Sequence, residues 1–219
     1  MKAVQVDSSV ETISTVIRDR ISRRDYLPGS RLKEVELAGE FGVNRARIRQ
    51  ALTSLQQRGL VEHTHNRGTI VAHIDAEKLH KLYDVFEVLE GLSARLAVLN
   101  STPGSWRELA RLFGEPMGRA VNDCDYDAFF AGIETYRAQV LERAANPLIT
   151  DVLTSIYDQT QFIIRRTLIL PNRARLSLDE HRAIIAAMEQ GDADEAQRLK
   201  LENMKTAREF LRKYESFVL

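Results

Sequence analysis

Four arginines in a stretch without carboxylates are the residues of this sequence best suited to bind a polyanion. They lie between residues 41 and 61, where neither Asp nor Glu occurs: Arg45, Arg47, Arg49 and Arg58. A patch of one charge attracts ions of the opposite sign, and guanidinium groups form paired hydrogen bonds with phosphate oxygens and base edges. The pattern favours nucleic acid as a partner, although a solvated helix face would carry the same charges.

The formal net charge of the whole chain is zero, with 31 Lys and Arg against 31 Asp and Glu over 219 residues. The two signs are nevertheless distributed unequally. Residues 1–75 carry 12 basic and 9 acidic side chains, and residues 76–219 carry 19 and 22. A neutral total therefore does not exclude nucleic acid, because it averages a basic first segment with an acidic second one.

The elements that must position the arginines are helices. Apolar residues recur at helical spacing over residues 8–25, 33–40 and 44–58. Gly42 suits the positive φ of a helix end, and Asn44 is a good N-cap for the third helix. Short helices joined by a glycine turn, the last with arginines near its start, are typical of a helix-turn-helix. In that motif the first turns of the recognition helix face the bases.

A β-hairpin is predicted directly after the third helix. Residues 60–64 and 69–72 are short strand-like runs, and the polar turn between them consists of His65, Asn66, Arg67 and Gly68. A hairpin at this place is the wing of a winged helix, and Arg67 at its tip would touch phosphate or a minor groove. We therefore place a winged helix-turn-helix DNA-binding domain at residues 1–75.

The rest of the chain, residues 76–219, reads as all-helical. Helices are predicted over about 76–99, 106–121, 126–144 and 147–169, then from 177 to 190 and from 193 to 213. Ser177 to Glu180 has the pattern of a capping box, which would start the fifth of these helices. The predicted fold class is mainly α, with one small β-hairpin.

The first half resembles the DNA-binding domain of the GntR family of transcriptional regulators. The matching segments are residues 27–32, 36–38, 42–52 and 59–61. The resemblance implies that Arg45 and Arg49 contact DNA, with wing residues 65–68 adding groove contacts. Three positions beside these arginines depart from the usual family pattern and would alter which bases are preferred: Asn44, Arg47 and Gln50.

The second half is similar to the FadR-type branch of that family, whose C-terminal FCD domain is a ligand-binding bundle of six or seven helices. Segments 88–97, 145–148, 180–184 and 191–193 carry the similarity. Many members of this branch hold a divalent metal with one Asp and three His. The matching positions here are Ile133, Arg137, His181 and Asn203. Only His181 is a metal-ligand type, and Arg137 repels a cation, so we expect no metal and no other cofactor.

A buried Arg137 needs a counter-charge, because an unpaired charge inside a bundle is costly. Either a protein carboxylate supplies it, for which Glu134, Glu180 and Glu202 are candidates, or a ligand does. We predict that a small organic acid or other anionic metabolite binds Arg137 together with His181 and Asn203, with Ile133 as an apolar wall. The alternative, an internally neutralised Arg137 with His181 as a structural remnant, stays open.

The sequence therefore predicts a transcriptional regulator, expected to be a repressor, that binds an operator as a homodimer and responds to an anionic effector. The alternatives are an effector-independent structural DNA-binding protein, a metal-dependent sensor and a helical-bundle enzyme. No HExxH, GxSxG or P-loop occurs, so we expect no enzyme activity. A single cysteine, Cys124, with no signal peptide or spanning segment predicts a cytoplasmic protein without a membrane partner.

Overall fold

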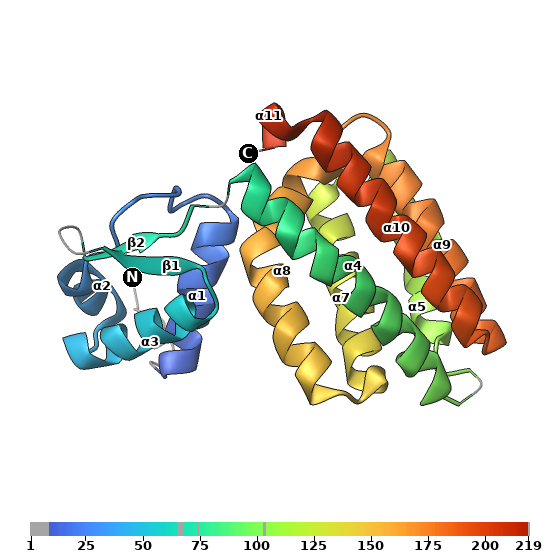
Figure 1. Ribbon diagram of the computed structural model, residues 1–219, viewed down its shortest axis with the longest axis horizontal. Helices are drawn as coiled ribbons and strands as arrows, with labels where there is room; N and C mark the ends of the chain where they lie inside the picture. The colour runs from blue at the N-terminus through green and yellow to red at the C-terminus, as the bar shows by residue number, and fades with distance from the viewer. Residues whose placement is uncertain (1–8, 65–67, 74, 103, 219) are drawn as a thin grey trace. The chain divides into compact units, whose positions relative to one another are not determined.

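The computed structural model describes residues 9–64, 68–73, 75–102 and 104–218 (Figure 1). Its internal contacts divide the chain into two compact units. The first consists of Met1–Asp75 with the segment Ser155–Phe162, and the second of Ala76–Thr154 with Ile163–Leu219.

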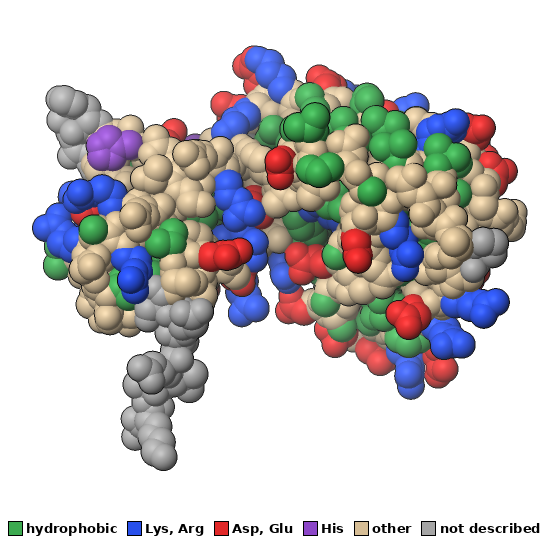
Figure 2. Space-filling view, turned by 90° about the horizontal axis from the view of Figure 1, so that it is seen from below, with side chains coloured by type: hydrophobic (Ala, Val, Ile, Leu, Met, Phe, Trp, Pro, Cys, Tyr) green, Lys and Arg blue, Asp and Glu red, His purple; other side chains and the backbone are tan. Residues whose placement is uncertain are grey.

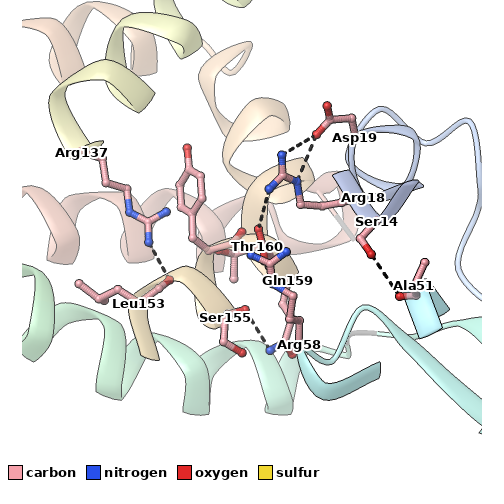
Figure 3. A network of polar contacts seen from close by, with 12 residues as sticks. Ser14, Arg18, Asp19, Ala51, Arg58, Arg137, Leu153, Ser155, Gln159 and Thr160 are labelled. Atoms are coloured by element: carbon pink, nitrogen blue, oxygen red, sulfur yellow. Dashed lines mark hydrogen bonds and ion pairs between the residues drawn. The ribbon is translucent and has the colours of Figure 1, made fainter. Parts of the chain in front are cut away.

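Three helices build the core of the first unit: α1 (Val10–Ser22), α2 (Glu34–Phe41) and α3 (Arg45–Gln57). α1 packs against α3 through Ile13 and Ile17, which meet Ile48 and Leu55 in one apolar cluster. The Ser14 hydroxyl donates to the Ala51 carbonyl across the same contact (Figure 3). The predicted helix-turn-helix is confirmed, and each helix lies within two or three residues of its expected bounds.

The turn between α2 and α3 follows from two residues. Gly42 has a φ of 65°, the left-handed conformation in which a side chain would be strained, so α2 ends there. The side chain of Asn44 accepts a hydrogen bond from the Arg47 backbone N–H at 2.9 Å, which satisfies a donor in the first turn of α3.

The wing is a two-stranded antiparallel sheet of β1 (Val61–Thr64) and β2 (Gly68–Val71), with Val61 opposite Val71. The segment before α2 runs along β2, because the Leu32 N–H donates to the Thr69 carbonyl at 2.9 Å. The predicted hairpin is confirmed. Its tip, with His65, Asn66 and Arg67, lies outside the described residues.

The second unit is helical throughout its described part. In order the helices after the wing are α4 (Ala76–Leu99), α5 (Arg107–Phe113), α6 (Glu115–Asn122), α7 (Tyr126–Ala144), α8 (Pro147–Leu168), α9 (Arg173–Gln190), α10 (Ala193–Lys213) and α11 (Glu215–Val218). All of them belong to the second unit except the segment Ser155–Phe162 of α8. α4 packs against α7 and α10, and α9 packs against α10 and α5. No helix among the described residues is long and apolar enough to cross a membrane.

Two helix boundaries in the second unit differ from the sequence-based prediction. The helix expected over 106–121 is broken at Gly114 into α5 and α6, and Arg182 donates to the carbonyls of Phe113 and Gly114 at the break. α9 begins at Arg173, so Ser177 is a buried residue inside the helix and does not start a capping box. The capping-box pattern was misleading because the preceding turn, with Asn172 at a φ of 63°, starts the helix earlier.

Candidate nucleic-acid interface and effector site

The recognition helix α3 has one buried and one exposed face. Ile48, Ala51, Leu52 and Leu55 are buried against the rest of the first unit. The predicted contact residues all lie on the exposed face: Asn44, Arg45, Arg47, Arg49 and Gln50. Because the helix is fixed by its apolar face, these side chains are presented to solvent from a defined backbone.

The two arginines expected to contact DNA share a carboxylate that the sequence did not single out. Arg49 donates from Nε to Glu34 Oε1 at 3.1 Å and from Nη2 to Oε2 at 2.9 Å. Arg45 donates from Nη2 to the same Oε2 at 3.3 Å. These hydrogen bonds, Arg49 first, lower the pKa of Glu34 below its usual value. No sequence spacing signals this contact, because it arises from the packing of α2 on α3.

A groove of about 410 Å³ lies beside these residues, between the start of α2, α3 and the strands of the wing. Four of the residues that line it are positively charged, namely Arg31, Lys33, Arg45 and Arg49, and the lining also includes His63, Glu34 and Glu36. Lys and Arg side chains are grouped on this unit in Figure 2. A basic concave surface next to an exposed helix start fits the phosphate backbone of a duplex.

Of the predicted wing residues, only Gly68 is described. It opens β2 with a φ of 72°, a conformation that favours glycine, and a Cβ there would lie 3.8 Å from the side chain of Arg31. A DNA contact by Gly68 stays a prediction. DNA contacts by His65, Asn66 and Arg67 stay predictions, because these residues lie outside the described part of the chain.

The second candidate site is a network of buried and half-buried polar side chains in the second unit, which we call the bundle cluster. Its members come from four helices: Glu90 of α4, Arg137 of α7, Arg173, Glu180 and His181 of α9, and Lys200 and Asn203 of α10. Two positively charged groups share Glu90, with Arg137 Nε 3.5 Å from Oε1 and Lys200 Nζ 3.0 Å from Oε2. Arg137 also donates to the Leu153 carbonyl at 2.6 Å (Figure 3).

Arg137 therefore pairs with Glu90, a carboxylate that the sequence did not suggest, and two of the three candidates named from the sequence bind other residues. Glu180 binds Asn203 and Arg173 instead, at 2.7 and 3.1 Å from its Oε2. Glu202 pairs with Arg198 on the exposed side of α10. Glu90 takes the place because α4 packs against both α7 and α10. The sequence contained one signal that Glu90 is buried. It lies four residues after the buried Phe86, and residues at that spacing share one face of a helix.

His181 occupies the predicted place in the core, with a defined tautomer. Its Nδ1 lies 2.7 Å from the Ser177 carbonyl oxygen, which can only accept, so Nδ1 carries the hydrogen and Nε2 a lone pair. The ring stacks on Phe113 at 5.2 Å and meets the edge of Tyr136 at 5.0 Å. Burial, followed by the charge of Lys200, lowers the pKa of His181 to about 3.

The polar atoms at this place that have no hydrogen-bond partner among the described residues include His181 Nε2 and the Tyr136 hydroxyl. His181 is 3% exposed and Tyr136 is 1% exposed. Burial raises the pKa of Tyr136, so its hydroxyl stays protonated. A buried polar atom without a partner is costly, so both atoms are suited to meet a small polar molecule.

The cluster does not fit a divalent cation. Among the described residues no group of three or more His, Cys, Asp or Glu could hold a metal ion. Lys200 pairs with one oxygen of Glu90 and Arg137 with the other, and the positive charges of both side chains repel a metal ion. Ile133, the predicted apolar wall, is half-buried, and its place in an effector site stays a prediction.

Two family models match the chain. The model described as "Bacterial regulatory proteins, gntR family" matches residues 9–71, which contain the helix-turn-helix and both strands of the wing. The model described as "FCD domain" matches residues 81–206, which contain the bundle cluster.

Curated relatives and solved structures agree with these matches. The galactonate operon transcriptional repressor of Escherichia coli (strain K12) is 25% identical over 216 residues, covering 89% of this chain and 93% of that protein. The Nta operon transcriptional regulator of Aminobacter aminovorans is 36% identical over 77 residues, covering 35% and 37%. The structure titled "E. coli McbR/YncC" has a TM-score of 0.81 at 19% identity, over 96% of this chain and 99% of that one.

Proposed function

Because this chain belongs to the GntR family of bacterial transcriptional regulators and carries an FCD domain, we propose that it binds an operator through α3 and the wing and responds to a small organic anion held in the bundle cluster. That it regulates transcription and is not an enzyme follows from the family and the relatives. The finer proposal also includes a homodimer that works in the cytoplasm, where the operator is.

Operator binding is proposed to depend on Arg45 and Arg49, with Asn44, Arg47 and Gln50 beside them. The supporting observation is that Arg45 and Arg49 are exposed in the first turns of α3 and line the basic groove. Base edges are read by such side chains in the major groove, while phosphate contacts fix the register.

Replacement of Arg49 by Ala tests this directly. The operator is first selected from a random DNA pool by the unmodified protein. Arg49→Ala is then expected to weaken operator binding by about ten- to hundredfold in a gel-shift titration. Arg23→Ala, which removes an exposed arginine at the end of α1, is the control and should leave affinity unchanged. Unchanged affinity of the Arg49 variant would remove this residue from the contact set.

The effector proposed for the bundle cluster carries both a carboxylate and a hydroxyl group. A carboxylate suits Arg137 and Lys200, which share one protein carboxylate between them. A carboxylate alone leaves His181 Nε2 unmatched, because that atom is a hydrogen-bond acceptor and needs a donor. One relative is named for a galactonate operon, and galactonate has both groups.

A thermal-shift comparison tests the effector class. Glycerate and gluconate should raise the melting temperature, and propionate and hexanoate, which lack the hydroxyl groups, should raise it less. A ligand at a hundred times its Kd stabilises the native state by about 2.7 kcal/mol. His181→Phe keeps an aromatic ring against Phe113 and removes the acceptor, so it should abolish the difference within each pair.

Effector-independent DNA binding is the second candidate function. It is favoured by the pairing of Arg137 with Glu90, which shows that the guanidinium has an internal counter-charge. If no carboxylate raises the melting temperature or changes operator affinity, this candidate replaces the effector proposal.

The homodimer is proposed to form along α4. Six apolar residues, which we call the α4 stripe, alternate at spacings of three and four: Leu82, Val85, Leu89, Leu92, Leu96 and Leu99. None of them is buried in the single chain, and Val85 and Leu99 are 47% and 59% exposed. This spacing is that of a coiled-coil seam, which buries its apolar side against a second helix. A second copy of the chain is the proposed partner, because a two-fold operator requires a two-fold protein.

A further inference from the structure

We propose that Glu34 is a positioning residue that supports Arg49 for base reading and so contributes to the sequence specificity of the protein. The inference rests on the proposed role of Arg49 at the operator. It adds a residue that is outside the recognition helix and that carries the same charge as DNA.

The hydrogen-bond pattern leaves one edge of the Arg49 guanidinium available. A guanidinium has five N–H donors in a planar fork. Glu34 accepts one N–H of Arg49 from Nε and one from Nη2. The two N–H groups of Nη1 and the second N–H of Nη2 point away from the carboxylate. Two N–H groups on one edge are what a guanine needs for paired bonds to its O6 and N7. The bidentate contact with Glu34 is therefore compatible with base reading.

Glu34 itself is held firmly. It is the first residue of α2, where the helix dipole favours a negative charge, and the backbone just before it is hydrogen-bonded to β2 through Leu32. Its side chain is 24% exposed, whereas that of Arg49 is 64% exposed. The carboxylate thus lies behind the guanidinium. Its lowered pKa keeps it ionised at neutral pH.

This arrangement acts in opposite directions on the two kinds of DNA binding. An arginine that is already oriented loses less rotational freedom when it meets a base, which strengthens operator binding. A fixed negative charge beside the groove weakens the sequence-independent attraction to phosphates. Both effects raise the ratio of operator affinity to non-specific affinity.

The test compares Glu34→Gln with Glu34→Asp. Gln has the size of Glu without its charge, and Asp keeps the charge but is too short to hold both donors of Arg49. Each variant should weaken binding to the selected operator by about three- to fivefold, the range of an exposed ion pair. Binding to a scrambled duplex of the same length should be unchanged for Asp and unchanged or tighter for Gln. The affinity ratio of operator to scrambled DNA therefore falls in both.

Glu40→Gln is the matched control. It removes one negative charge from the same helix, and its carboxylate binds Arg20, which is outside the groove. The control should leave the affinity ratio unchanged. Melting temperatures of all variants are measured alongside, so that a loss of folded protein is not mistaken for a loss of affinity.

The outcomes separate this inference from the proposed function. If Arg49→Ala weakens operator binding and both Glu34 variants keep the wild-type ratio, the positioning role is wrong while the DNA contact stands. The ratio of operator to scrambled-DNA affinity could instead fall equally in Glu34→Gln and Glu40→Gln but not in Glu34→Asp. That result would show that only the net charge of α2 matters, and it would also overturn the inference. Normal operator binding by Arg49→Ala would remove its premise and the proposed contact together.

Discussion

At the scale of single residues, His181 makes stability depend on pH. Its pKa is about 3 in the folded protein, against 6.5 for an ordinary histidine. Between these values the unfolded chain binds a proton that the folded chain excludes, so stability decreases as the pH falls through this window. We expect the free energy of unfolding to fall by roughly 2 kcal/mol from about pH 7.5 to about pH 5 on account of this group.

Chemical denaturation at a series of pH values measures this dependence. His181→Phe has no proton to exclude, so its free energy of unfolding should change less over the same range than that of the wild type. The difference in slope between the two proteins is the quantity to compare, because other groups contribute equally to both. Parallel curves would contradict a buried neutral His181.

Some residues of the two candidate sites could be predicted from the sequence, and others could not. Arg45, Arg49 and His181 could be assigned to their helices because motif spacing fixes their positions along the chain. Glu34 and Glu90 were missed because their roles depend on which helix packs beside them, and no local pattern reports that. Arg137 was recognised as needing a counter-charge, but its partner lies 47 residues earlier in the chain, on α4.

At the scale of elements, the break between α5 and α6 depends on a side chain from α9. Arg182 donates from Nε to the Phe113 carbonyl at 2.7 Å and from Nη2 to the Gly114 carbonyl at 2.8 Å. The Phe113 carbonyl lies at the end of α5, where the helix provides no partner of its own, and the Gly114 carbonyl also accepts from the Gly118 N–H of α6 at 3.1 Å. The sequence predicted one continuous helix here, since the contact that ends α5 comes from about 70 residues away.

We expect Arg182→Ala to lower stability by about 1 kcal/mol, because it removes both charge-assisted hydrogen bonds at the end of α5. Hydrogen exchange should rise first in α5 and α6. Arg119→Ala is the control, since Arg119 is 67% exposed and makes only a 3.7 Å ion pair with Glu115. Equal stability of the two variants would show that the break is maintained by Gly114 and Pro116 alone.

At the scale of the whole molecule, the α4 stripe predicts the oligomeric state. Val85→Lys places a charge within the apolar α4 stripe, and an unpaired charge there opposes association. We expect this variant to sediment as a monomer and to bind operator more weakly, because one copy engages one half-site. Leu27→Lys, at a residue 56% exposed in the first unit, should still sediment as a dimer. A dimeric Val85 variant would move the interface elsewhere.

The overall architecture followed from the sequence more completely than the site did. Helical periodicity, the glycine turn at Gly42 and the strand-like runs beside the wing are local signals, and each gave an element that the structure contains. The bundle cluster is a product of packing among α4, α7, α9 and α10, and sequence spacing alone could place only some of its members.

α4 has a mechanical consequence of its own. It is a single helix of 24 residues, roughly 36 Å long at 1.5 Å per residue, and it starts immediately after Asp75. Glu90 lies partway along it and forms ion pairs with Arg137 of α7 and Lys200 of α10. The proposed anion would compete with Glu90 for those positively charged groups, and a helix of this length would carry a displacement at Glu90 to both of its ends. Under the proposed function, α4 would therefore act as a lever that pivots at the bundle cluster.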